Sequence, residues 1–180
     1  MSIDQQIREL VRHRAGFACE FCGVTETDTG GELTIDHYHP SAKGGSDDPA
    51  NLIYCCSRCN LYKLDYFPFR PNDPSLWNPR MEPFSDHFIE LDNGMLHALT
   101  PIGEFTLVRI RLNRPSLAAY RQQKRQHQEN QRNLERYKEL VLLLEHLNNQ
   151  LAELTQEQQR LLGEQQRLLM YFLNKKYTPY

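Results

Sequence analysis

Two Cys-x-x-Cys pairs constrain the fold of this chain more than any other sequence feature. Cys19 and Cys22 form the first pair, and Cys56 and Cys59 form the second. Four thiolates in such pairs can bind one tetrahedral zinc ion, provided that folding brings the pairs together. The odd number of cysteines, in two clusters, argues against a disulfide framework. We therefore expect a structural zinc site, with Cys55 left over as a small apolar residue. The alternative is a set of buried thiols.

A second group of polar residues lies between and within these pairs. Asp36 and Asn60 carry oxygen ligands that suit a hard divalent cation such as Mg²⁺. His37 has a reference pKa of about 6.5, so its imidazole can take a proton from water near neutral pH. Hydrolysis of a phosphodiester needs an activated water and a cation beside the developing negative charge. These residue types therefore predict a metal-dependent phosphodiesterase site.

The same stretch resembles the HNH endonuclease family, which has the ββα-metal nuclease fold. The resemblance covers roughly residues 1–70 and is carried by Asp36-His37, Lys43-Gly44-Gly45, Asn51-Leu52 and Cys56-x-x-Cys59-Asn60-x-x-Lys63. It is strongest to the zinc-bound subgroup, in which two Cys-x-x-Cys pairs flank the active site.

The resemblance implies a role for each motif residue. His37 is then the general base, and Asp36 and Asn60 hold a catalytic Mg²⁺ or Mn²⁺. Asn51 ties the His-bearing loop to the helix by hydrogen bonds. The family often has His at the positions of Asp36 and Asn60, but both variants occur among active members. Products with a 5′ phosphate and a 3′ hydroxyl are implied as well.

Local patterns predict an α+β fold with three parts. We expect a zinc-stapled ββα domain over 1–70, with a helix from Ile3 to Ala15, a polar loop over 24–31, strands at 33–35 and 51–54, and a helix over 57–64. An accessory layer over 71–114 contains a β-hairpin around Asp92-Asn93-Gly94. Thr100-Pro101 can start a helix, whereas the β-branched content of 105–110 favours a strand. A long helix over 115–180 follows, with Asn113 as its cap and Pro115 in its first turn.

The distribution of charge bears on nucleic-acid binding. Residues 1–70 hold 7 basic against 10 acidic side chains, so that the predicted nuclease core attracts phosphate weakly on average. Five arginines recur along one face of the long helix, at positions 114, 121, 125, 132 and 136. The predicted nucleic-acid contacts are Lys43, Lys63, Arg121, Arg125 and Arg132. The alternative for the helix is a solvated face of Arg and Gln.

The rest of the long helix has a heptad pattern. Leucine recurs every seventh residue at 140, 147, 154, 161 and 168, and the second series is Tyr137, Leu144, Leu151, Gln158, Gln165 and Phe172. This stripe extends over about 54 Å of helix. One isolated helix cannot bury it, so we expect a homodimer or a higher homo-oligomer. A break at Asn148-Asn149 that folds the helix back is the alternative, but the heptads stay in phase across it.

Composition points away from membranes. The mean hydropathy is −0.67, and there is no apolar run of the length that a membrane span requires. The N-terminus lacks the basic start and the apolar centre of a signal peptide, so we expect a cytoplasmic protein.

Two functions remain open from the sequence. The first is a metal-dependent DNA endonuclease, for which restriction or defence against foreign DNA is one setting. The second is a non-catalytic, zinc-scaffolded module that binds DNA or protein and is recruited through its coiled coil. The Asp-His-Asn set favours the first function, and the acidic core and the prominent coil leave room for the second.

Overall fold

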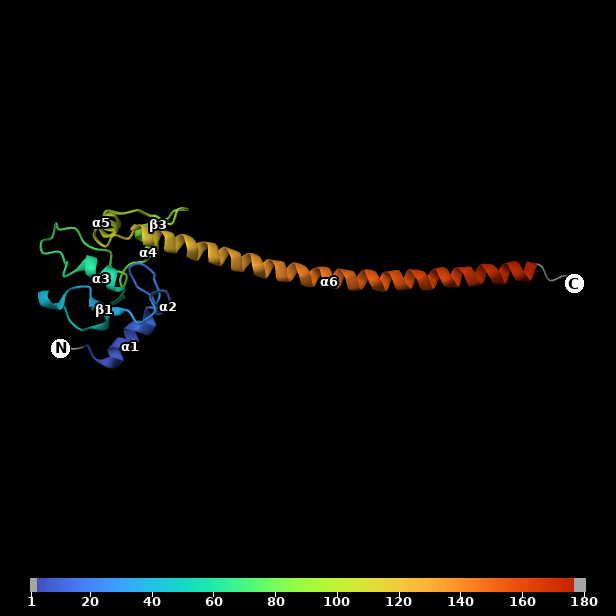
Figure 1. The fold of residues 1–180 in the computed structure, drawn as a ribbon, viewed down its shortest axis with the longest axis horizontal. Coiled ribbons are helices and arrows are strands. Elements are labelled where there is room, and N and C mark those ends of the chain that lie inside the picture. The colour runs from blue at the N-terminus through green and yellow to red at the C-terminus, as the bar shows by residue number, and fades with distance from the viewer. Residues whose placement is uncertain (1–2, 177–180) are drawn as a thin grey trace. The chain divides into compact units, whose positions relative to one another are not determined.

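A computed structural model describes residues 3–176, with side chains through residue 174 (Figure 1). The chain divides into two compact units, residues 1–125 and residues 126–180. The first unit mixes short helices with two small sheets, and the described residues of the second are helical. The α+β class expected from the sequence is confirmed. The division into 1–70, 71–114 and 115–180 stays a prediction.

The ββα arrangement lies at the start of the first unit. Strands β1 (Thr34–His37) and β2 (Leu52–Cys55) pair antiparallel, with Asp36 opposite Ile53 and His37 opposite Leu52. Helix α3 (Ser57–Lys63) follows β2 directly. All four residues of β2 are buried, because this strand runs through the core between the sheet partner and α1 (Gln5–Arg14). Both strands and the helix were predicted, and β1 also includes the Asp-His pair.

The polar loop expected over residues 24–31 contains a short helix, α2 (Glu26–Thr29). Thr25 caps this helix through its hydroxyl, which accepts a hydrogen bond from the Asp28 N–H at 3.2 Å. The Asp28 carboxylate in turn accepts from the Thr25 N–H at 2.8 Å. This reciprocal capping box explains why so polar a segment is ordered.

Aromatic side chains pack the segment after residue 70 against the core around the first cysteine pair. Trp77 is buried, and its ring lies 6.3 Å from that of Phe21 and 5.3 Å from that of Phe88. Phe21 lies between Cys19 and Cys22, whereas Phe88 begins strand β3 (Phe88–Glu90) of the hairpin. One ring therefore joins two parts of the first unit that are far apart in sequence.

The hairpin and the helix after it complete this layer. The predicted hairpin is confirmed as β3 (Phe88–Glu90) and β4 (Leu96–Ala98). The undecided segment forms helix α5 (Pro101–Arg109), because the Thr100 hydroxyl caps it and Pro101 fits its first turn. Gly103 must be glycine, since a Cβ there would lie 2.5 Å from the His87 carbonyl oxygen.

Helix α4 (Phe84–His87) precedes β3, and helix α6 (Pro115–Lys176) ends the described chain. Helix α6 passes through Asn148-Asn149 without a break, as the phase of the heptads predicts. Asn113 does not cap it. The Asn113 side chain instead accepts from the Leu96 N–H at 2.7 Å and donates to the Leu96 carbonyl at 2.8 Å, which binds α6's start to the hairpin.

Candidate functional site

Folding brings the two Cys-x-x-Cys pairs together. The sulfur atoms of Cys19, Cys22, Cys56 and Cys59 all lie within 4.8 Å of one another, and all four residues are buried. The Cys22 and Cys56 sulfurs are 3.7 Å apart. Four sulfurs bound tetrahedrally at about 2.3 Å from zinc lie about 3.8 Å apart. The cluster therefore has the donor set and the dimensions of a structural zinc site.

A tight turn and a helix start position the two cysteine pairs in the cluster. The Gly23 N–H donates to the Cys19 carbonyl at 2.7 Å, and Gly23 has φ of 75°, which gives the tight turn predicted after the first pair. Cys56 is the N-cap of α3, and Cys59 lies within the first turn of that helix. Hydrogen bonding with the thiols of Cys19 and Cys22 lowers the pKa of Cys56, which favours the thiolate that zinc requires.

Cys55 lies outside the cluster, as the sequence indicated. It is fully buried in β2, and burial raises the pKa of its thiol to about 12. Because its sulfur lies outside the cluster, Cys55 packs in the core as a small apolar group.

The guanidinium of Arg114 lies against the cysteine cluster. Its Nη1 and Nη2 atoms are 4.0 and 3.9 Å from the Cys59 sulfur. Four thiolates around a bound Zn²⁺ would carry excess negative charge, and this arginine would offset part of it. Arg114 was expected only as part of the arginine row on the long helix, and its contact with the cluster was not predicted.

Asp36 of β1 is joined to α3 by a buried ion pair. Lys63 is fully buried, and its Nζ lies 2.8 Å from Asp36 Oδ2 and 2.6 Å from the His37 carbonyl oxygen. The first contact is ionic rather than a well-directed hydrogen bond, since the buried Oδ2 has no hydrogen-bond partner of good geometry. This lysine holds the Asp-His pair against the helix that carries Asn60.

The His37 imidazole pairs with an acidic side chain. Its Nε2 lies 2.7 Å from Asp47 Oδ1. An ionised carboxylate can only accept, so Nε2 carries the hydrogen and the neutral ring has its free lone pair on Nδ1. Within the described residues, Nδ1 forms no protein hydrogen bond. Asp47 was not singled out from the sequence, because nothing in its local pattern distinguishes it from Asp48.

Asn51 stabilises the loop that follows His37. Its Oδ1 accepts from the His39 N–H at 2.8 Å, and its Nδ2 donates to the carbonyls of His39 at 3.0 Å and Ser46 at 2.8 Å. These three bonds close the loop between β1 and β2. The partners lie within the loop itself and not on α3.

Asn60 lies on α3, one helical turn before Lys63. Its side chain is half-buried, and no hydrogen bond to it is formed within the described residues. The carboxylate of Asp36 and the amide of Asn60 carry oxygen atoms of the kind that a hard cation binds. Two protein oxygens suffice for Mg²⁺, which keeps several waters and takes further oxygens from a substrate phosphate.

Two of the basic residues predicted to bind nucleic acid do not have free side chains. The buried Lys63 side chain contacts Asp36 and the His37 carbonyl. Arg121 is 8% exposed, and its guanidinium donates to the Gly94 carbonyl at 3.0 Å and the Leu112 carbonyl at 2.7 Å. Both assignments are corrected, because a cation buried among carbonyls cannot reach a phosphate.

The remaining basic candidates are more accessible. Lys43 is exposed and donates to the Asp65 carbonyl at 2.6 Å. Arg125 donates to the Leu91 carbonyl at 3.2 Å, so it is partly engaged by the hairpin turn. Arg132 is exposed, with no ion pair within the described residues. Of the five predicted residues, Lys43 and Arg132 have exposed side chains that can reach a phosphate.

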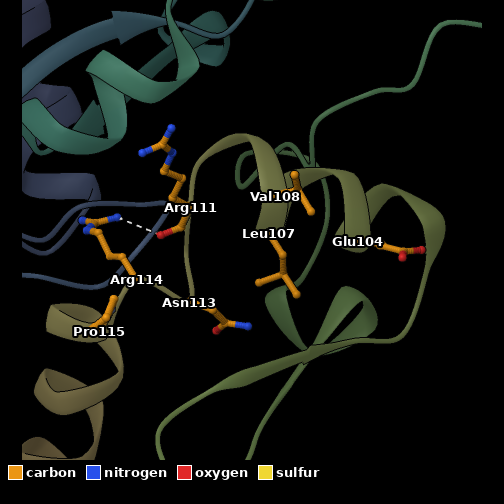
Figure 2. Close-up of a pocket in the computed structure, with 7 residues that line it drawn as sticks. All are labelled: Glu104, Leu107, Val108, Arg111, Asn113, Arg114 and Pro115. Atoms are coloured by element: carbon orange, nitrogen blue, oxygen red, sulfur yellow. Dashed lines mark hydrogen bonds between the residues drawn. The ribbon is translucent and has the colours of Figure 1, made fainter.

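A hollow at the corner between α5 and α6 lies apart from these residues (Figure 2). Arg114 donates from Nη1 to the Arg111 carbonyl at 3.3 Å across one side of it. Its lining residues are Glu104, Leu107, Val108, Arg111, Asn113, Arg114 and Pro115. None of them is a predicted catalytic residue or metal ligand, and we assign the hollow no role.

Part of this chain matches a known protein family. Residues 19–65 match the family model described as HNH endonuclease. No curated protein and no solved structure gives a significant match to the chain. Among the described residues, no helix is long and apolar enough to cross a membrane.

The matched segment contains both cysteine pairs, both strands and α3. An HNH domain indicates a nuclease-type or other nucleic-acid-related function, and the family generally uses a divalent metal. Residues 19–65 of this chain therefore match an HNH endonuclease domain, and the four-cysteine cluster is consistent with the subgroup in which two Cys-x-x-Cys pairs bind zinc.

Proposed function

We propose that this protein is a divalent-metal-dependent DNA endonuclease. The observation that carries the proposal is the contact between β1 and α3 through Lys63, which links Asp36 and His37 to the helix bearing Asn60. An acid, a base and an amide on neighbouring elements of an HNH domain match what phosphodiester hydrolysis requires.

The chain's own residues divide the chemical work. His37 takes the proton from the attacking water through Nδ1, the nitrogen that Asp47 leaves unprotonated. Asp36 and Asn60 would hold Mg²⁺ or Mn²⁺, which stabilises negative charge on the scissile phosphate when bound. Asn51 is a positioning residue that fixes the loop after His37. Water attack on phosphorus breaks the bond to the 3′ oxygen, which takes a proton from solvent, and leaves a 5′ phosphate and a 3′ hydroxyl.

DNA contact draws on side chains outside the chemical centre. Lys43 extends from the Gly-containing loop of the HNH motif, and Arg132 extends from α6. Because residues 1–70 carry more acidic than basic side chains, such local cations matter more than the average field. On the family resemblance alone, we place the cleavage in restriction or defence against foreign DNA.

A second candidate function is a zinc-scaffolded module that binds DNA or protein without cutting. The observation in its favour is that His37 is already paired with Asp47 and Asp36 with Lys63. Both contacts would serve a purely structural role equally well.

We also propose that the second unit self-associates through the heptad stripe of α6. Its apolar members are all 49% to 68% exposed within one chain, which is unfavourable for so long a row. Truncation after Arg136 is expected to convert an oligomer into a monomer in analytical ultracentrifugation. An unchanged mass would mean that the stripe does not drive association.

The decisive experiment for catalysis is cleavage of supercoiled plasmid by the zinc-loaded protein with added Mg²⁺ or Mn²⁺. His37→Ala and Asn60→Ala are expected to abolish cutting and to retain zinc. His97→Ala is the matched control, since His97 is an exposed histidine on the hairpin. Equal cutting by His37→Ala would contradict the assigned base. No cutting by the unaltered protein, with DNA still bound, would support the binding module.

A further inference from the structure

The heptad stripe of the second unit contains two polar residues. We call its two series the seam, with the first positions at 137, 144, 151, 158, 165 and 172, and the second at 140, 147, 154, 161 and 168. Every second position is leucine, whereas the first positions include Gln158 and Gln165. Both glutamines lie on the helical face that needs a partner. Their amides each offer two donors and an acceptor, which must be satisfied if the seam is covered.

Antiparallel pairing leaves these amides without partners. In an antiparallel two-stranded coil, each first position packs in a layer with a second position of the other chain. Because every second position is leucine, any antiparallel register that keeps the seam places Gln158 and Gln165 against leucine. Buried amide groups without hydrogen bonds are strongly disfavoured.

Parallel pairing satisfies them. In a parallel coil each first position meets a first position of the other chain, so Gln158 can face its own copy. Two facing carboxamides are complementary, since each can donate its N–H to the other's carbonyl oxygen.

The register follows from the same two residues. With no stagger, the pair has two glutamine layers, at 158 and 165. A stagger of one heptad keeps a single glutamine layer and sets the other glutamines against Leu151 and Phe172. The unstaggered register therefore leaves the fewest amides unpaired, which is the way polar seam residues specify register.

We propose that two copies of this chain pair through the seam in parallel and in register, with Gln158 and Gln165 selecting both properties. The proposal rests on the self-association proposed above and does not depend on nuclease chemistry. In such a pair, residue 126 of one chain lies beside residue 126 of the other. The coil would then present two copies of the HNH domain to one nucleic acid.

Disulfide trapping in the full-length, zinc-loaded protein tests the proposal. Leu144→Cys and Leu151→Cys each add one thiol at a first position, about 10.5 Å apart along the helix, and keep both glutamines. In a parallel, in-register pair each thiol faces its own copy, within the distance of about 7 Å between Cα atoms that a disulfide requires. Both variants are expected to form covalent dimers on mild oxidation. Gln156→Cys, on the opposite face of the helix, and the unaltered chain are the controls.

The outcomes separate the proposals. A sedimentation mass twice that of one chain, with trapping at both 144 and 151 well above the controls, supports the parallel pair. A mass of two chains with trapping at one position or at neither would contradict the parallel, in-register pairing. Self-association of the chain would still be supported. A trimer or larger mass overturns the pair. A monomer overturns self-association itself, whatever the plasmid assay shows.

Discussion

Lys63 and Asp36 form an ion pair with 2.8 Å between Nζ and Oδ2, and the lysine has no exposed surface. A buried charge is tolerated only when it is paired, and Lys63 also donates to the His37 carbonyl at 2.6 Å. The pair therefore joins β1, which carries Asp36 and His37, to α3, which carries Asn60.

Lys63→Met is expected to lower the free energy of unfolding of the zinc-loaded protein by about 3 to 5 kcal/mol, because it leaves the Asp36 carboxylate unpaired. Urea unfolding followed by fluorescence of Trp77, the single tryptophan, measures the change. Lys43→Met is the matched control and should cost less than about 1 kcal/mol, since Lys43 is exposed. Adding Asp36→Leu to Lys63→Met should restore much of the loss. A small effect of Lys63→Met alone would contradict the buried pair.

Asp47 is expected to matter for catalysis because of its contact with His37 Nε2. Asp47→Asn should reduce plasmid cleavage by about 10- to 100-fold, as loss of an orienting partner commonly does. Cleavage rates at saturating metal, with zinc content measured in parallel, test this. Asp48→Asn is the control, because Asn can replace Asp48 as the cap whose carboxylate accepts from the Ala50 N–H. Unchanged cleavage by Asp47→Asn would show that the contact does not orient the base.

The cysteine cluster predicts opposite outcomes for two neighbouring residues. Cys56→Ser is expected to abolish zinc binding and to unfold the HNH domain, since one of four thiolates is lost. Cys55→Ala should keep one zinc per chain and cost only about 1 kcal/mol of stability. Zinc content by metal analysis and Trp77 fluorescence give both readouts. Loss of zinc from both variants alike would contradict the assignment of Cys55 as a packing residue.

High pH should reveal the burial of Tyr38. Its hydroxyl donates to the Leu76 carbonyl at 2.6 Å, and burial raises its pKa to about 12. In the unfolded chain a tyrosine has a pKa of about 10, so between pH 10 and 12 the unfolded state binds fewer protons than the folded state. Stability therefore falls as pH rises through this window, by up to about 2 to 3 kcal/mol from this residue.

Tyr38→Phe should remove that part of the pH dependence. The variant is expected to be about 1 kcal/mol less stable at pH 7, because it lacks the hydrogen bond, and to lose less stability between pH 10 and 12. Urea unfolding of Tyr38→Phe and of the unaltered protein across this range tests the prediction. Parallel stability curves for the two proteins would mean that Tyr38 ionises as readily folded as unfolded.

Local patterns predicted the elements whose signals agree with one another. Strands β1 and β2 contain the β-branched residues Thr34, Ile35 and Ile53 near turn residues, and the heptads of α6 repeat in phase. Segment 100–110 could not be assigned, because β-branched residues favoured a strand while Thr100 and Pro101 favoured a helix. The cap decided the outcome. The burial of Lys63 and Arg121 was not predictable, since their partners at His37 and Gly94 are distant in sequence and become neighbours only on folding.

The two arginines at positions 121 and 132 were predicted to act alike, and the structure separates them. Arg132→Gln is expected to leave stability unchanged and to reduce the salt dependence of DNA binding by about one unit of slope, as loss of one phosphate contact does. Arg121→Gln should instead lower stability by about 1 to 3 kcal/mol, because it leaves the buried carbonyls of Gly94 and Leu112 with fewer donors. Fluorescence anisotropy of a labelled duplex across salt concentrations, with urea unfolding of each variant, gives both quantities. A salt slope that changes for Arg121→Gln at full stability would return that residue to the DNA interface, and an unchanged slope for Arg132→Gln would remove the other from it.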